Sequence, residues 1–191
     1  MNNTIRERFA ETAGLLGETV EHLADRIAAA ADLIIAAYKA GGCVFAFGNG
    51  GSAADAQHIA SELVGRFLRE RKGLRAQALT TDTSILTSVG NDYGFETVFA
   101  RQLEACAAAG DVAIALTTSG NSPNVLAALV KAREIGMETI ALTGAGGGKC
   151  AALADVLLDV PSDRTPRVQE AHAVIYHVLC ELVENACTDC Q

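Results

Sequence analysis

Two pairs of polar residues have spacings that could build one reactive centre. His58 and Glu62 lie four residues apart, and Gln169 and His177 lie eight apart near the C-terminus. Four residues make about one turn of an α-helix and eight make about two, so each pair falls on one face of its segment if that segment is helical. Imidazole and carboxylate groups bind metals and transfer protons. If these two faces meet, the residues on them predict a metal-assisted enzyme.

A glycine-rich run lies just before the first of these pairs. Residues 48–52 read Gly-Asn-Gly-Gly-Ser and follow the apolar run 43–47. Glycines let backbone N–H groups approach a ligand closely, and free N–H groups at a helix start bind phosphate. Ser52 with Asp55 three residues later is typical of a helix-capping pair. The loop therefore predicts a site for a phosphorylated small molecule.

A second polar loop follows the apolar run 112–116. It carries four hydroxyl groups before Pro123, a residue that suits the first position of a helix: Thr117, Thr118, Ser119 and Ser122. A purely structural interpretation is that Ser122 caps the helix and the other hydroxyls are solvated in a turn. Capping accounts for one hydroxyl and leaves three, which favours phosphate binding.

Two nucleotide-binding patterns fit the glycine runs less well. Residues 48–53 satisfy GxGxxA after a strand, as in dinucleotide-binding folds. The first acidic residue after the next strand, however, is Asp82, about 30 positions beyond the loop where ~20 is expected. The run 144–150 has one residue too few between its glycines for a P-loop, and Cys150 stands where a magnesium-binding Ser or Thr belongs.

The distribution of apolar runs predicts an α/β fold, a three-layer sandwich around a five-stranded parallel sheet. Helical-looking segments separate the runs, which are residues 43–47, 76–79, 112–116, 139–142 and 156–160. Continuous apolar runs are typical of parallel strands that are buried on both faces. Ligands in such folds bind at the carboxyl ends of the strands, where both polar loops would lie.

The first 40 residues are predicted to be helical, as N-terminal helices that precede the sheet. Apolar residues recur there at helical steps, and Asp32 or the alanines before it are expected to divide the segment into two helices. Such a segment has more apolar face than one sheet edge can cover. We therefore expect residues 1–40 to act as an oligomerisation segment, with the same helix of another subunit packed against it.

Length and charge narrow the class of protein. With 191 residues and half of them hydrophobic, the chain 1–191 is expected to be a single domain. A formal charge of −8 argues against a nucleic-acid partner. Neither an apolar run of membrane-spanning length nor a signal-peptide core is present, so we expect no membrane association and a cytoplasmic location.

The six cysteines do not suggest a disulfide framework. Most lie in apolar surroundings, where a thiol packs as a small hydrophobic group. Cys187 and Cys190 have CxxC spacing, but a lone CxxC lacks the second ligand pair of a zinc knuckle. We expect a structural or incidental role for all of them.

Several segments together resemble the phosphoheptose isomerases, a branch of the sugar isomerase (SIS) domain superfamily. The resemblance spans nearly the whole chain and rests on residues 47–58 with Glu62 and Gly65-Arg66, residues 89–94, residues 117–124 and residues 167–172. It implies a flavodoxin-like topology and conversion of sedoheptulose 7-phosphate to D-glycero-D-manno-heptose 7-phosphate. That reaction starts the bacterial synthesis of heptose for lipopolysaccharide cores and other surface glycans.

The resemblance also implies specific roles for residues and an assembly. It implies a homotetramer whose sites use residues of neighbouring subunits. The ligands of a Zn²⁺ cofactor would be His58, Glu62, Gln169 and His177. The substrate contacts would be Asn49, Gly50, Gly51, Ser52, Glu62, Asn91, Asp92, Thr117, Thr118, Ser119, Ser122 and Gln169.

Ketose-to-aldose conversion needs one base for the carbon-bound proton and one acid-base group for the oxygens. Glu62 and His177 suit these catalytic roles. A carboxylate held by zinc is a weaker base, so either Glu62 loosens its coordination or Asp92 assists, and the sequence leaves both open. His172 is interpreted as a hydrogen-bonded core residue and His22 as a surface residue.

Two non-enzymatic classes remain as alternatives. A non-catalytic SIS-domain tetramer that binds a replication initiator or another protein would not need the four proposed ligands. A phosphosugar-sensing module of a transcription regulator would normally carry a DNA-binding domain, and no basic helical segment is present.

Overall fold

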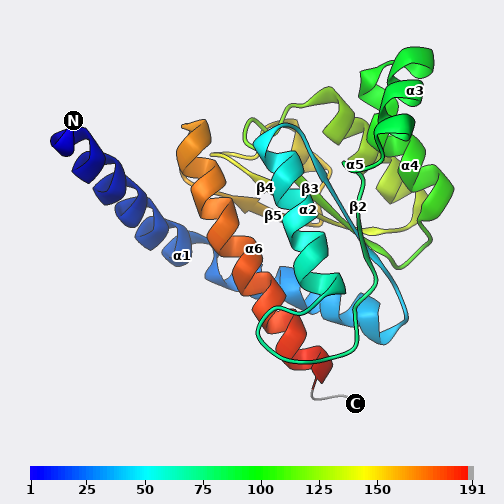
Figure 1. The fold of residues 1–191 in the computed structure, drawn as a ribbon, viewed down its shortest axis with the longest axis horizontal. Helices are drawn as coiled ribbons and strands as arrows, with labels where there is room; N and C mark the ends of the chain where they lie inside the picture. The colour runs from blue at the N-terminus through cyan, green and yellow to red at the C-terminus, as the bar shows by residue number, and fades with distance from the viewer. Residues whose placement is uncertain (189–191) are drawn as a thin grey trace.

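The computed structural model describes residues 1–188, which form a five-stranded parallel sheet with helices on both faces (Figure 1). The strands run in the order β2-β1-β3-β4-β5, which is the flavodoxin-like order. Their bounds are β1 (Val44–Gly48), β2 (Ala76–Ala78), β3 (Val112–Thr117), β4 (Glu138–Thr143) and β5 (Val156–Asp159). The predicted fold class and all five predicted strands are confirmed, with ends that shift by one residue.

Helices connect these strands and cover the sheet. They are α1 (Asn2–Lys39), α2 (Gly51–Val64), α3 (Thr83–Tyr93), α4 (Val98–Cys106), α5 (Pro123–Ile135) and α6 (Thr165–Thr188), with short 3₁₀ helices η1 (Phe95–Thr97) and η2 (Gly148–Ala152). In the central strands, successive side chains alternate between two cores. Ile114 of β3 packs in the core with α1, α2 and α6, whereas its neighbour Ala115 packs in the core with α4 and α5. Burial on both faces explains why these strands read as continuous apolar runs.

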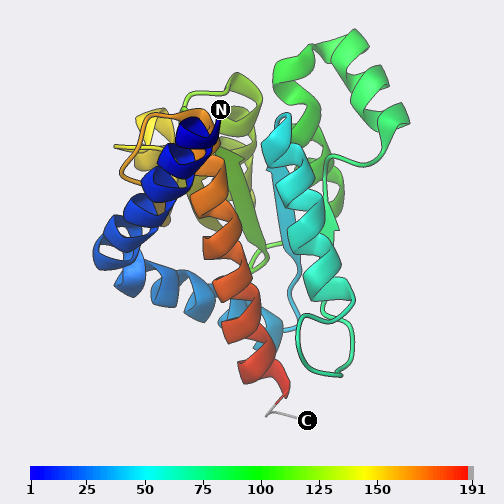
Figure 2. The same ribbon diagram turned by 60° about the vertical axis from the view of Figure 1, so that its left-hand side comes forward.

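The prediction of two N-terminal helices is wrong, because α1 is continuous over 38 residues. Figure 2 shows that this helix changes direction along its length. Gly17 and Thr19 lie in the first half, and the Thr19 hydroxyl donates to the carbonyl of Leu15 at 2.7 Å, a bond that bends helices without breaking them. The second half packs on α6 through buried residues such as Leu23 and Ile34.

The carboxyl ends of the strands and the start of three helices share one edge of the molecule. Helices α2 and α5 follow β1 and β3 there, and α6 begins beside them (Figure 1). The sequence therefore places both polar loops and the N-terminal end of α6 at the edge where open parallel sheets bind ligands.

Three of the cysteines are buried thiols, as expected. Cys43, Cys150 and Cys180 are each less than a tenth exposed. Burial raises the pKa of the Cys150 thiol to about 11 and that of Cys180 to about 12, so both stay protonated and unreactive. Cys190 of the CxxC pair lies outside the described residues. No helix within residues 1–188 is both long and apolar enough to cross a membrane.

Candidate functional site

A cavity of about 300 Å³ lies at the carboxyl ends of β1 and β3. The first loop lines it with Asn49–Ser52, the second loop with Leu116–Ser119 and Ser122, and the start of α6 with Thr165 and Gln169. Three helices, α2, α5 and α6, begin at this cavity. Each helix start carries a partial positive charge, and its first N–H groups suit a phosphate group. Pro123 and Pro166 carry no N–H, and the N–H of Val125 bonds with Oδ1 of Asn124, so α2 offers the most such groups.

The first loop uses glycine where the backbone demands it. Gly50 precedes α2 with φ at 58°, a conformation that side chains disfavour, and it accepts the first helical bonds through its carbonyl. The predicted Ser52–Asp55 capping pair is wrong. α2 begins at Gly51 with no side-chain cap, so Ser52 is inside the first turn, where it is buried, and Asp55 turns toward α6.

The hydroxyls of the second loop do not cap helix α5. Ser122 occupies the capping position before Pro123 but makes no capping bond, and its hydroxyl lies 3.0 Å from that of Thr117. Reciprocal amide bonds of 2.9 and 2.8 Å between Asn49 and Asn124 join the two loops. The interpretation of Ser122 as only a cap is therefore not supported, and its hydroxyl remains at the cavity with that of Thr117.

The start of α6 closes the cavity against the first loop. A Cβ atom added at Gly51 would lie 2.6 Å from Nε2 of Gln169, so a larger residue there would displace this side chain from its present position. Thr165, the first residue of α6, also lines the cavity and was not predicted from the sequence. Its only sequence signal is a hydroxyl at a helix start, and the helix start itself follows an irregular segment.

Helices α2 and α6 bring His58, Glu62 and His177 together below this cavity. Nε2 of His58 lies 3.0 Å from Oε1 of Glu62 and 3.5 Å from Nε2 of His177. The two histidine rings meet edge to face, with 4.9 Å between their centroids. Contacts across 119 residues of sequence thus confirm that the two predicted helical faces meet. The Glu62 side chain is a fifth exposed and that of His58 less than half, so a ligand can reach both.

A buried tyrosine contacts the other side of the His58 ring. The hydroxyl of Tyr176 lies 3.1 Å from Nδ1 of His58 and 3.4 Å from Oδ1 of Asp55. Burial, with Asp55 as a further cause, raises the pKa of Tyr176 to about 12. Burial also raises the pKa of Asp55, against the lowering effect of the bond from Tyr176.

A buried ion pair holds the segment that follows α2. The Glu184 carboxylate accepts bonds from the backbone N–H groups of residues 67–69 and from Nε of Arg71 at 3.1 Å. Arg71 in turn donates to the carbonyls of Glu62 and Leu63, which lie at the end of α2. Burial alone would raise the pKa of Glu184, but these N–H groups and Arg71 outweigh it and lower the pKa.

The segment 67–71, which this ion pair holds, also contacts the cluster of His58, Glu62 and His177. The ring of Phe67 stacks on that of His177, with centroids 5.7 Å apart and planes at 27°. The backbone N–H of Phe67 is one of the groups that Glu184 binds. One buried carboxylate therefore fixes the aromatic surface against which His177 rests, and its partner Arg71 fixes the helix end that carries Glu62.

Asn91 and Asp92 do not lie in this cavity. They are exposed at the end of α3, and the Asn91 amide donates to Asp92 at 2.7 Å. Within this single chain, Asp92 therefore does not lie beside Glu62. Their role in substrate binding stays a prediction.

The two remaining histidines lie where the sequence placed them. His172 is fully buried on α6, and its Nε2 bonds with the carbonyl of Thr143 at 3.1 Å. Burial lowers the pKa of His172 to about 4, so the ring is neutral at pH 7. His22 is exposed on α1, 3.7 Å from Asp159.

The donor set is suitable for zinc, although it is incomplete. Within residues 1–188, no three His, Cys, Asp or Glu side chains are arranged to hold a metal as they stand. Two imidazoles and a carboxylate are nevertheless preferred zinc ligands, and two donors of a tetrahedral Zn²⁺ site lie about 3.4 Å apart, close to the observed separations. Gln169 lies two helical turns from His177 and beside Gly51, so its role as a fourth ligand stays a prediction.

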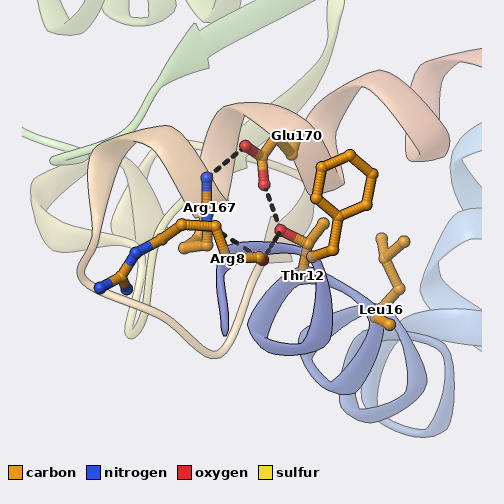
Figure 3. Close-up of a pocket in the computed structure, with 7 residues that line it drawn as sticks. Arg8, Thr12, Leu16, Arg167 and Glu170 are labelled. Carbon is orange, nitrogen blue, oxygen red and sulfur yellow. Dashed lines mark hydrogen bonds and ion pairs between the residues drawn. The ribbon is translucent and has the colours of Figure 1, made fainter. Parts of the chain in front are cut away.

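A second cavity, of about 370 Å³, lies between the starts of α1 and α6 (Figure 3). Glu170 bonds with Arg167 on its own helix and with the hydroxyl of Thr12, while Arg167 donates to the carbonyl of Arg8. Arg167 pairs with Glu170 within the cavity wall, and Arg8 pairs with Glu11 outside it. We assign these contacts to the docking of α1 on the helix that carries Gln169.

Fold and site together define a class, and comparison with known proteins agrees. Residues 8–144 match the SIS domain family. A phosphoheptose isomerase from Aquifex aeolicus is 56% identical over 185 residues, which are 97% of each chain. Within the SIS domain class, this chain belongs to the phosphoheptose isomerase family.

Solved structures show the same relationship. A phosphoheptose isomerase from Neisseria gonorrhoeae superposes with a TM-score of 0.92 at 45% identity, covering 96% of this chain and 98% of that one. One from Francisella tularensis gives 0.93 at 39% identity, covering 96% and 97%. The resemblance inferred from the sequence is confirmed, and membership of this family identifies the chain as an isomerase.

Proposed function

We propose that this protein converts sedoheptulose 7-phosphate to D-glycero-D-manno-heptose 7-phosphate, the first step of bacterial heptose synthesis. One observation carries the proposal beyond family membership. His58, Glu62 and His177 meet on α2 and α6, the two helices whose starts line the cavity together with the hydroxyl- and glycine-rich loops. A phosphosugar offers groups for both halves, a phosphate for the cavity and a carbonyl end for the cluster.

Phosphate binding falls to the loop half of the site. Non-proline residues at the starts of α2, α5 and α6 supply N–H groups, and the hydroxyls of residues 117–119 and 122 supply further donors. These groups bind without a lysine or arginine in the cavity wall, which is how a chain of net charge −8 holds an anion. We assign Asn49–Ser52 and Gln169 to the same half.

Proton transfer falls to the helix half. Glu62 as a carboxylate removes the C1 proton of the ketose and returns it to C2, so the double bond moves through an enediolate. His177 moves the hydroxyl proton from O1 to O2 in the same exchange. Phe67 and the Arg71–Glu184 pair hold both groups in place. We propose that Glu62 is the base, because its carboxylate lies in the cluster with His58 and His177, whereas Asp92 could reach this site only from a neighbouring subunit.

A zinc ion is part of the proposal. His58, Glu62 and His177 would hold it, with Gln169 as the fourth ligand. When bound, Zn²⁺ supplies Lewis acidity that polarises the substrate carbonyl and stabilises negative charge on its oxygen. The chain's own residues supply the proton transfers.

A homotetramer is proposed as the working form. An apolar groove of about 230 Å³ runs between α1 and α6, and its rim exposes Val20, Val174, Val178 and Leu182. Such a face is typical of an interface between subunits. Asn91 and Asp92 would then complete the site of a neighbouring subunit. We place the enzyme in the cytoplasm, since a phosphorylated sugar does not cross a membrane unaided.

The deciding experiment measures conversion of sedoheptulose 7-phosphate by the purified protein, with and without a chelator, beside a His177→Ala variant. We expect turnover that falls on chelation, returns with Zn²⁺ and is lost in the variant. A folded tetramer without turnover after Zn²⁺ is restored would contradict the proposal. It would favour the alternative of a non-catalytic SIS-domain tetramer that binds a protein partner.

A further inference from the structure

The ring of His58 is held from a side that the proposed reaction does not use. Tyr176 is 3% exposed, and its hydroxyl approaches Nδ1 of His58 at 3.1 Å and Oδ1 of Asp55 at 3.4 Å. The tyrosine and histidine rings meet edge to face, with centroids 5.3 Å apart and planes at 65°. Nε2 of the same ring faces Glu62 and His177.

Metal binding requires one particular tautomer of the His58 ring. An imidazole binds zinc only through a nitrogen that carries no proton, so Nε2 must be bare and Nδ1 must carry the proton. A proton on Nδ1 needs an acceptor, and the hydroxyl of Tyr176 is the group in reach. A tyrosine alone does not fix the direction of this bond, because its hydroxyl donates as readily as it accepts.

Asp55 fixes the direction of the hydrogen bond between Tyr176 and His58. An ionised carboxylate only accepts hydrogen bonds, and the phenol has a single proton. When that proton points to Asp55, the Tyr176 oxygen is free to accept from Nδ1 of His58. The opposite arrangement, with Tyr176 donating to Nδ1, places the proton on Nε2 and leaves the Asp55 oxygen facing a lone pair.

We propose that Tyr176 and Asp55 form a positioning pair that holds His58 in the tautomer and orientation needed to bind zinc. The inference rests on the proposed metal site and adds two residues to it. Neither residue belongs to the proposed zinc ligands or the proposed substrate contacts. Metal-bound histidines commonly donate their second N–H to such a partner, and loss of the partner weakens metal binding about 10- to 100-fold.

The test measures Zn²⁺ affinity of the whole protein by competition with a chromophoric chelator. We expect Tyr176→Phe to bind Zn²⁺ about 10- to 100-fold more weakly than the unmodified protein. Asp55→Ala should weaken binding at least as much, since the freed phenol can then donate to Nδ1 and favour the wrong tautomer. Asp55→Asn should weaken it less, because its amide oxygen still accepts.

Tyr38→Phe is the matched control. The Tyr38 hydroxyl also donates one hydrogen bond, but to the carbonyl of Arg75 at 3.2 Å and not to His58 or Asp55. Its Zn²⁺ affinity should equal that of the unmodified protein within about twofold. Thermal unfolding of each metal-free variant separates a local effect from loss of the fold, and Asp55→Ala decides the question if Tyr176→Phe does not fold.

The outcomes separate this inference from the proposed function. If Tyr176→Phe and Asp55→Ala both keep the unmodified affinity, the positioning pair is refuted while the zinc site stands. If the unmodified protein binds no Zn²⁺, the inference falls with the metal site. Conversion of sedoheptulose 7-phosphate, assayed separately, then decides whether the isomerase proposal survives.

Discussion

The two halves of the candidate site are built in different ways. The loop half consists of backbone N–H groups and short hydroxyls, fixed by Gly50, Gly51 and Pro123 and by the Asn49–Asn124 amide pair. The helix half consists of long side chains from α2 and α6, which rely on further side chains to stay in place. Binding of the phosphate therefore depends on chain geometry, and proton transfer depends on a supporting layer of residues.

This difference suits the two tasks. A phosphate keeps its charge throughout the reaction, so rigid donors that bind substrate and transition state equally are adequate. Proton transfer requires groups that change protonation state and must be aligned to within a fraction of an ångström. We therefore expect substitutions in the helix half to lower kcat and those in the loop half to raise KM.

The largest expected effect on catalysis comes from Glu62→Gln. The amide keeps the shape of the side chain but cannot accept the substrate proton, so kcat should fall about 1,000-fold, or about 4 kcal/mol in the barrier. Steady-state kinetics with sedoheptulose 7-phosphate measure it, with Glu104→Gln, an exposed residue of α4, as control. A kcat within threefold of the original would remove Glu62 from the role of base and return Asp92 as a candidate.

The supporting layer is tested by Glu184→Gln. Side chains of Arg71 and Glu184 are 1% and 2% exposed, so loss of one charge leaves the other buried and unpaired. Such a change costs about 3–5 kcal/mol of stability. Urea unfolding measures it against Glu104→Gln, which breaks an ion pair of half-exposed side chains and should cost less than about 1 kcal/mol. Equal midpoints for the two variants would show that the pair does not hold the segment after α2.

A pH effect is expected from His172, which lies behind the loop half on α6. Its pKa is about 4 in the folded chain and near 6.5 when exposed, so the unfolded chain binds the extra proton first. Stability is therefore unaffected above pH 6.5 and falls by about 3 kcal/mol as the pH drops from 6.5 to 4. Unfolding measured at both pH values should show a smaller drop for His172→Gln, whose amide does not titrate. The same drop in both proteins would assign acid sensitivity to other groups.

The sequence predicted most of the loop half and only part of the helix half. Glycine runs and hydroxyls after apolar runs are local signals, and strands buried on both faces leave continuous apolar stretches. The meeting of His58 with His177 followed from helical spacing, since both helices begin at the same sheet edge. Tyr176 gave no signal, because a tyrosine among apolar residues of α6 reads as core until Asp55 and His58 are placed beside it.

The errors have the same origin. Asp55 three residues after Ser52 fits a capping pattern, but the actual helix start depends on the conformation of Gly50, which spacing does not reveal. The break expected near Asp32 did not occur because α6 and the sheet bury one face of α1 along its second half. Residue spacing reveals neither the conformation of a glycine nor the tertiary burial that overrides local preference in α1.

The smallest expected effect concerns one hydroxyl of the loop half. Ser122→Ala removes one hydroxyl from the loop half and leaves the backbone of α5 unchanged, since Ser122 makes no capping bond. If this hydroxyl binds phosphate equally in the ground and transition states, KM should rise about tenfold with kcat unchanged, which is about 1.4 kcal/mol of binding. Ser84→Ala, an exposed hydroxyl at the start of α3, should change neither parameter. A fall in kcat for Ser122→Ala would mean that the loop half also aligns the reacting carbons, because the phosphate would then act as the fixed point from which the distance between C1 and Glu62 is set.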